Sequence, residues 1–233
     1  MLTIGLRNQL RRSLFLIALR LRSRGEDWRE YIARKGVTDI CIDGYPRSAN
    51  SFSVRMFRQA NPGATVAHHT HSIANLRYSI KHAIPTVVLI RQPLDAIASS
   101  VIAHKDQNIE LEVSRYVDFY DWVAQHRDRI VMAEFNDVIH NMNAIIGSVN
   151  QKFKTSFSSL DDVAEADAQV KQDIEQRFDR LGQNEMSHIK PIPTKSRDEE
   201  KMRLRVAVEN HSGFARAQSL YDLLTATPST ANH

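Results

Sequence analysis

Residues 37–52, with the sequence VTDICIDGYPRSANSF, carry the most informative pattern in the chain. The first seven are mostly apolar, which is typical of a buried strand, and Gly44-Tyr45-Pro46 ends that strand. From Ser51 onward the apolar residues recur at helical spacing. A strand, a tight polar loop and a helix in this order leave backbone N–H groups free at the start of the helix, where a phosphate or sulfate binds readily.

The loop at 44–51 also carries side chains that suit an anion. Arg47 has a permanent charge and a forked set of donors that matches phosphate or sulfate. Ser48 and Ser51 add hydroxyl groups, and Asn50 adds an amide. The loop is not a Walker A loop, because the second glycine and the lysine of GxxxxGK[ST] are absent. A helix capped by a serine or asparagine after a polar turn is the alternative interpretation.

A second polar turn follows the most apolar strand of the chain, TVVLI at 86–90. That strand ends abruptly at Arg91, and a helix follows. Ser99 lies about one and a half turns into this helix, so Arg91 and Ser99 can converge on one anion. Pro93 and Asp95 suit the start of a helix, which makes a well-capped helix without a ligand the alternative.

The rest of the chain alternates strands with helices. We expect further strands at 64–67 and 129–135 and helices at 27–35, 73–81, 94–104, 110–127 and 136–153. Such alternation is typical of an α/β fold with a central parallel sheet that helices cover on both faces. Ligands in such sheets bind beyond the carboxyl ends of the strands. Both polar turns follow these ends, and we therefore expect the functional site there.

Length and composition predict one domain. The chain has 233 residues, 42% of them hydrophobic, which is enough for a substantial core but too few for two large domains. We assign 37–233 to a single α/β domain and 1–36 to basic amphipathic helices that precede it. A net charge of +4 and a pI near 9.3 favour an anionic partner, such as a nucleotide, an acidic glycan or a membrane surface, and we expect no nucleic-acid partner.

Cysteine usage and the amino-terminal segment bear on location. The single cysteine, Cys41, excludes an internal disulfide and fits a reducing compartment, so we expect a cytoplasmic protein. The apolar run at 14–19 is interrupted by Arg20 and Arg22, and it is far shorter than the roughly 20 apolar residues of a spanning helix. A basic amphipathic helix within 1–24 then lies either at the periphery of a membrane or against its own domain.

His68, His69 and His71 form a cluster between the two polar turns. Removal of a proton from an acceptor hydroxyl needs a base whose pKa is near neutral, and histidine is the obvious candidate. Near-adjacent histidines also suggest zinc. However, they lack HExxH spacing and the chain has no cysteine pair, so we expect no metal.

Both turns resemble motifs of the sulfotransferases that use 3′-phosphoadenosine 5′-phosphosulfate (PAPS). The first resembles the family's 5′-phosphosulfate loop, which typically reads Pro-[Lys/Arg]-Ser-Gly-[Thr/Asn]-[Ser/Thr]-[Trp/Phe]. Residues 46–52 fit this pattern except at Ala49, where glycine is commoner. Alanine is a mild departure if its φ is negative. The spacing R-x-P-x-D-x-x-x-S from Arg91 to Ser99 resembles the family's 3′-phosphate motif.

The resemblance implies a P-loop-like three-layer fold with additional helices at both termini. It also implies transfer of a sulfuryl group from PAPS to a hydroxyl or amine, with a saccharide as one candidate acceptor. In the family a histidine at this place is the catalytic base, which implies His71 as first choice and His69 as reserve, with Arg47 stabilising charge on the transferred group. The residues implied for donor binding are Arg47, Ser48, Ala49, Asn50, Ser51, Phe52, Arg91 and Ser99, together with Lys195, Ser196 and Arg197 in a basic segment over the nucleotide.

Two other classes of protein stay open at this point. An ATP-dependent small-molecule or nucleotide kinase would share the fold and the phosphate-binding geometry, but it would require magnesium. A nucleotide- or glycan-binding protein without catalytic activity would bind the donor and transfer nothing.

Overall fold

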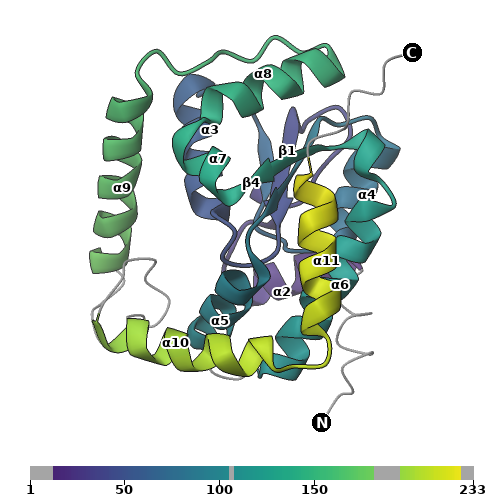
Figure 1. Cartoon of the computed structure of the whole chain (residues 1–233). Coiled ribbons are helices and arrows are strands. Elements are labelled where there is room, and N and C mark those ends of the chain that lie inside the picture. The colour runs from purple at the N-terminus through teal and green to yellow at the C-terminus, as the bar shows by residue number, and fades with distance from the viewer. Residues whose placement is uncertain (1–12, 105–107, 181–194, 227–233) are drawn as a thin grey trace.

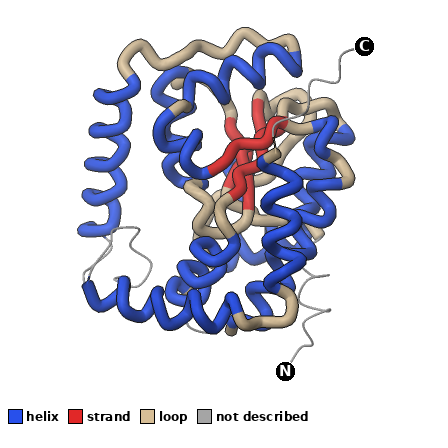
Figure 2. The backbone as a smooth tube through the Cα atoms, in the orientation of Figure 1, coloured by secondary structure: helices blue, strands red, loops and turns tan. Residues whose placement is uncertain are grey.

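A computed structural model of the chain describes residues 13–104, 108–180 and 195–226. Its centre is a sheet of four parallel strands in the order β2-β1-β3-β4 (Figure 2). The strands are β1 (Ile40–Gly44), β2 (Val66–His68), β3 (Thr86–Ile90) and β4 (Val131–Glu134). This sheet confirms the predicted α/β fold.

The side chains of the strands alternate between the two faces of the sheet, as the pleat requires. Ile40 and Ile42 enter one apolar core, whereas Cys41 enters the other. Val87 and Val88 of β3 divide in the same way. Because both faces are buried, each strand reads as a continuous apolar run, and this explains why the strands could be located from the sequence.

Helices cover both faces of the sheet (Figure 1). The core that contains Ile42 is completed by α3 (Asn50–Ala60), α7 (Phe135–His140), α8 (Met142–Phe153) and α9 (Val163–Arg180). The core that contains Cys41 is completed by α4 (Ile73–Lys81), α5 (Pro93–Ala103), α6 (Ile109–Ala124), α10 (Lys195–Glu209) and α11 (Phe214–Thr225). Together with the sheet they make the three layers that were predicted.

The amino-terminal helix α2 (Leu14–Ser23) packs on the domain with one face only. Ile17 and Leu21 are buried against Ala74 at the start of α4. Phe15 and Leu19 on the opposite side are 75% and 53% exposed. Packing on the domain is thus observed for this helix, and contact with a membrane stays a prediction. Within the described ranges, no helix has the length and apolar character needed to cross a bilayer.

The predicted helix at 27–35 is wrong, because only a short 3₁₀ turn, η1 (Trp28–Glu30), forms there. Two backbone N–H groups that a longer helix would use are bound to side chains instead, one of them on the distant α4. Ala33 N donates to Asn75 Oδ1 at 2.9 Å, and Arg34 N donates to Thr38 Oγ1 at 2.9 Å. Tertiary hydrogen bonds have therefore overridden local helical propensity.

Three other boundaries also differ from the predictions. The strand predicted at 37–43 begins only at Ile40, since Thr38 N turns back to Arg34 O. The helix predicted at 136–153 is divided into α7 and α8 at Asn141, whose ψ of 38° lies outside the helical region. The helix predicted at 110–127 ends at Ala124 and is followed by the 3₁₀ turn η2 (Arg127–Arg129).

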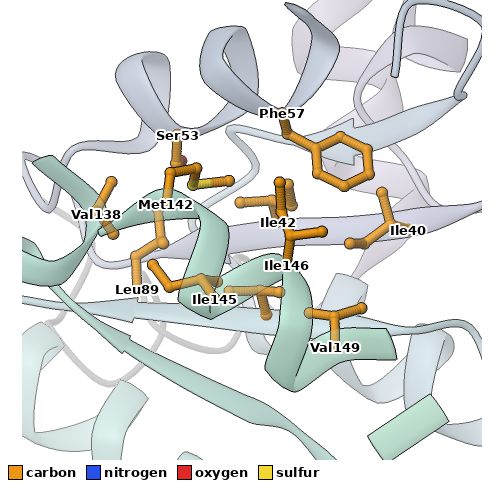
Figure 3. A pocket seen from close by; sticks show the side chains of 11 residues that line it. Ile40, Ile42, Ser53, Phe57, Leu89, Val138, Met142, Ile145, Ile146 and Val149 are labelled. Atoms are coloured by element: carbon orange, nitrogen blue, oxygen red, sulfur yellow. The ribbon is translucent and has the colours of Figure 1, made fainter. Parts of the chain in front are cut away.

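A small apolar cavity lies between the sheet, α3 and α8 (Figure 3). Its walls include Ile42, Leu89 and Ile146, and Ser53 is the one hydroxyl-bearing residue among them. The space open to a water-sized sphere is only about 10 Å³, which is close to the minimum for a single water. We therefore interpret it as a packing gap in the core and not as a ligand site.

Candidate functional site

The order of the strands brings the two polar turns together. β1 and β3 are adjacent and parallel, so the turn after Gly44 and the turn after Ile90 leave the same edge of the sheet. Gly44 is required there because a Cβ at this position would lie 2.5 Å from Leu89 O. Only a residue without a side chain lets the end of β1 pass so close to β3.

Two arginines connect the turns directly. Arg47 Nε donates to Ser99 Oγ at 2.9 Å, and Arg91 Nη1 donates to Arg47 O at 3.0 Å. The guanidinium of Arg91 also lies 4.1 Å from the centre of the Phe135 ring. Burial lowers the pKa of Arg91, and the charges of Asp95 and Glu134 oppose that change. The sequence-predicted Arg47, Arg91 and Ser99 are thus brought into one cluster.

The helix that follows the first turn has a start suited to an anion. Helix α3 begins at Asn50, and no side chain caps it at Ala49. The N–H groups of its first turn therefore point towards the loop without a capping oxygen. Together with two permanent cations, this uncapped end fits a phosphate or sulfate group.

The side chains within the loop have different surroundings. Ser51 is exposed, so its hydroxyl can reach a ligand. Ser48 and Asn50 are buried, and Phe52 packs in the core with α8. Asn50 Nδ2 donates to Tyr45 O at 3.0 Å and so closes the turn. Any contact of Ser48, Asn50 or Phe52 with a ligand would have to come through the backbone.

One buried polar atom of this loop, Asn50 Oδ1, has no hydrogen-bond partner within the described ranges. Unsatisfied buried groups are rare in folded proteins, and strain, a functional role or a bound water or ion can account for one. This observation agrees with a specialised role for the loop.

The backbone is strained at the same place. Six non-glycine residues in the described ranges have positive φ, and four of them belong to the two segments of the site: Arg47, Ala49, His69 and His71. Ala49 has φ of 66°, so the condition for a mild departure from the family pattern is not met. Strained backbone of this kind persists only where the surroundings impose it, and it clusters at functional sites.

A buried carboxylate holds the histidine segment against β1. Asp43 is completely buried, and its two oxygens accept hydrogen bonds from Gly44 N, Thr70 N, Thr70 Oγ1 and His71 N at 2.6–3.1 Å. Burial raises the pKa of Asp43, and these hydrogen bonds oppose the rise. The carboxylate fixes the backbone of Thr70 and His71 beside the end of β1.

His71 is oriented as a base. Its Nδ1 lies 2.7 Å from Gly44 O, a carbonyl that can only accept, so Nδ1 carries the proton and Nε2 keeps its lone pair. Burial, with the charge of Arg115 as the next cause, lowers the pKa of His71 to about 3. The ring is therefore neutral at physiological pH and can accept a proton, but a pKa this far below neutral makes it a weaker base in the free protein than was expected from the sequence.

Several supporting residues were missed from the sequence. Tyr116 and Tyr120 on α6 donate their hydroxyls to Arg91 O at 2.8 Å and to Leu89 O at 2.7 Å. Tyr45 donates to the buried Glu112, which in turn lies 3.5 Å from Arg115. The sequence shows Tyr116 and Tyr120 within the helix predicted at 110–127. No local signal, however, assigned their hydroxyl groups to the carbonyl groups at the end of β3.

The carboxy-terminal region reaches the site through α10. Lys201 Nζ and Arg205 Nη1 contact Asp95 Oδ1 at 2.9 and 3.0 Å. Burial tends to raise the pKa of Asp95, but the hydrogen bond and charge of Lys201, with further charges nearby, lower it overall. The predicted Lys195, Ser196 and Arg197 form the start of α10, and their side chains lie outside the described part of the structure.

The histidine cluster does not have the arrangement of a metal centre. In the described ranges, no three side chains of His, Cys, Asp or Glu converge as ligands for an ion. His68 and His69 instead contact each other, and their other ring nitrogens contact Arg58 and Ser51. His71 contacts Gly44 O.

Comparison with known proteins gives matches among solved structures only. No protein-family model matches the chain, and no curated protein sequence does. Among solved structures, the crystal structure of mouse sulfotransferase SULT7A1 complexed with PAP aligns over 85% of this chain and 92% of that chain, with 10% sequence identity and a TM-score of 0.42. A likeness of this size assigns no family, and the function has to be argued from the geometry of the site.

The strain at Ala49 leads to a prediction about stability. A left-handed conformation costs a residue with a Cβ about 1–2 kcal/mol, whereas glycine adopts it freely. Glycine also makes the unfolded chain more flexible, which lowers the free energy of unfolding by about 0.4–1 kcal/mol. Relief of the strain is the larger effect, so we expect Ala49→Gly to raise the free energy of unfolding by about 0.5–1 kcal/mol. Urea denaturation measures this quantity. Ala60→Gly, the same exchange in the last turn of α3, should instead destabilise the protein, and an equal loss in both variants would contradict the account.

Proposed function

We propose that the protein is a sulfotransferase that moves a sulfuryl group from PAPS to a hydroxyl or amine. The observation that carries this proposal is the direct contact between the two turns, in which Arg47 binds Ser99 and Arg91 binds the Arg47 carbonyl. PAPS has anionic groups at two places, the 5′-phosphosulfate and the 3′-phosphate. A site with two joined cationic turns at the ends of adjacent strands suits such a molecule.

The geometry supports one orientation of the donor. The 3′-phosphate would lie at Arg91 and Ser99, beyond the end of β3. The 5′-phosphosulfate would lie over the uncapped start of α3, where Ser51 is exposed. Arg47 stands between the two sites and contacts Ser99. No metal is needed for this arrangement, because guanidinium and N–H groups supply the positive charge.

The proposed reaction is an in-line displacement at sulfur. The acceptor oxygen or nitrogen forms a bond to sulfur while the bond from sulfur to the 5′-phosphate oxygen breaks. The acceptor proton passes to Nε2 of His71, which the hydrogen bond from Nδ1 to Gly44 O leaves available. The products are the sulfated acceptor, 3′-phosphoadenosine 5′-phosphate (PAP) and the proton. Arg47 and the α3 amides stabilise the charge that grows on the phosphate oxygen.

The surroundings of His71 favour an acceptor with negative charge. Burial is the largest cause of its lowered pKa, and the charges of Arg115 and Arg20 act in the same direction. These two arginines belong to α6 and α2, so positive charge reaches the region around the base from two helices. An acidic saccharide is the acceptor class that this charge supports best.

Two other functions are less well supported. A kinase needs a lysine for the transferred phosphate and an acidic ligand for magnesium, whereas Arg91 follows β3 and the first loop contains no lysine. A binding protein without activity would not need the free Nε2 of His71 beside the anion site.

Binding of the product PAP tests the donor site. At a concentration about 100 times its Kd, PAP stabilises the protein by about 2.7 kcal/mol, which corresponds to a rise in Tm of roughly 5–10 °C for a chain of this size. We expect this shift in a thermal-shift assay without metal. Arg91→Ala should remove it, and Arg77→Ala, an exposed charge on α4, should retain it. A response to ATP with magnesium alone would move the function to phosphoryl transfer.

Turnover of radiolabelled PAPS tests the chemistry. We expect Arg47→Ala to lower kcat about 10²–10³-fold through loss of charge stabilisation. His71→Ala should lower kcat about 10²–10⁴-fold and leave PAP binding close to that of the wild type. Because the pKa of His71 is lowered to about 3 in the free protein, the ring should add no inflection of its own to the pH profile of kcat/KM for PAPS between about pH 5.5 and 8. Turnover comparable to that of the wild type in either variant would refute the role proposed for that residue.

A further inference from the structure

Four polar side chains form a continuous chain from the surface to the anion-binding loop. Arg58 Nη2 lies 3.3 Å from His68 Nε2, and His68 Nδ1 lies 2.7 Å from His69 Nδ1. His69 Nε2 then lies 2.9 Å from Ser51 Oγ. Arg58 and Ser51 both belong to α3, whereas the two histidines belong to the end of β2 and the residue after it.

The chemistry of the first member fixes the direction of every hydrogen bond. A guanidinium has donors and no acceptor, so His68 Nε2 must accept from Arg58. A neutral imidazole carries one proton, which in His68 is then on Nδ1 and is donated to His69 Nδ1. The proton of His69 is therefore on Nε2, and it is donated to Ser51 Oγ. The opposite direction would place two N–H groups face to face at Arg58 and His68.

The backbone supports this arrangement of the two rings. His68 N donates to Tyr31 O at 3.1 Å, and the ring of Tyr31 lies 5.1 Å from that of His68. His69 is held at φ of 54°, a conformation that costs free energy and is imposed by its surroundings. The rings are thus fixed by elements on both sides.

The direction of the chain determines what Ser51 can do. Because its oxygen accepts from His69, its own hydrogen is left for another partner. Ser51 is exposed in the first turn of α3, whose amino end has no side-chain cap. A hydroxyl whose hydrogen points outward makes a stronger hydrogen bond to an anionic oxygen than to a neutral one, and it cannot donate to a cation.

We propose that Arg58, His68 and His69 form a hydrogen-bond relay that turns the Ser51 hydroxyl into a fixed donor towards the 5′-phosphosulfate of the sulfuryl donor. The proposal rests on the proposed function for the identity of the ligand, but not for the direction of the relay. It assigns His69 as a positioning residue, because its Nδ1 lone pair accepts from His68 and is not available to an acceptor proton. His71 is then the base of the cluster.

The direction of the relay can be measured without any ligand. Long-range ¹⁵N–¹H NMR spectra distinguish which ring nitrogen of a neutral histidine is protonated. We expect His68 to be protonated on Nδ1 and His69 on Nε2, with signals assigned through His68→Gln and His69→Gln. Protonation of His69 on Nδ1 would overturn the proposal, whatever the protein binds.

Its effect on the ligand can be measured with PAP and a charge-matched pair of variants. Arg58→Glu replaces a donor by a group that only accepts, so the relay loses its direction and Ser51 can donate to His69 instead. We expect the Kd for PAP to rise about tenfold, the size of one hydrogen bond to a charged group. Arg55→Glu makes the same charge change on the same helix and should have a clearly smaller effect. Arg58→Lys keeps a donor at this position and should retain most of the wild-type affinity for PAP.

A double-mutant cycle separates the relay from a general effect of charge. Ser51→Ala removes the final hydroxyl, so Arg58→Glu in that background should cost no more than Arg55→Glu does. Full additivity of Ser51→Ala and Arg58→Glu would refute the relay. If wild-type protein showed no affinity for PAP, the donor assignment and the role of Ser51 towards it would fail, while the NMR spectra would still decide the direction of the relay.

Discussion

The site depends on one buried carboxylate at the end of β1. Asp43 accepts four hydrogen bonds, three of which come from Thr70 and His71 and so tie the segment after β2 to the strand beside it. A buried carboxylate without such partners would be strongly destabilising, so the backbone around it has little freedom. This constraint explains why His71 can be held at φ of 48° with its Nδ1 against Gly44 O. The proposed base is therefore oriented by the sheet itself.

The second element of the site is the contact between its two cationic turns. Arg91 gives a hydrogen bond to the carbonyl of Arg47, while its own carbonyl accepts from Tyr116. The turn after β1 is therefore supported from β3 and α6, and this support allows left-handed conformations at Arg47 and Ala49. Strain, uncapped amides and permanent charge lie within a few residues of one another. An anion that binds there meets donors already in place, which is the arrangement that favours electrostatic catalysis.

Much of the fold could be predicted because its strands are short apolar runs between breakers. The strand at 86–90 and the helix at 73–81 have the predicted bounds. The helix at 27–35 could not be excluded locally, since Asn75 binds the N–H group of Ala33 only in the folded chain. In the site, the convergence of Arg47, Arg91 and Ser99 followed from motif and topology. The roles of Asp43, Tyr116 and Lys201 depend on contacts between distant segments, for which no spacing rule exists.

The most direct test of this account is a crystal structure of the protein with PAP in the absence of metal. We predict the 3′-phosphate against Arg91 and Ser99, and the 5′-phosphate over the start of α3 within hydrogen-bond distance of Ser51 Oγ. His71 Nε2 should face the open side of the 5′-phosphate, where the sulfuryl group of PAPS would lie. A nucleotide bound at another edge of the sheet, or one held in the opposite direction, would contradict the assignment of the donor site.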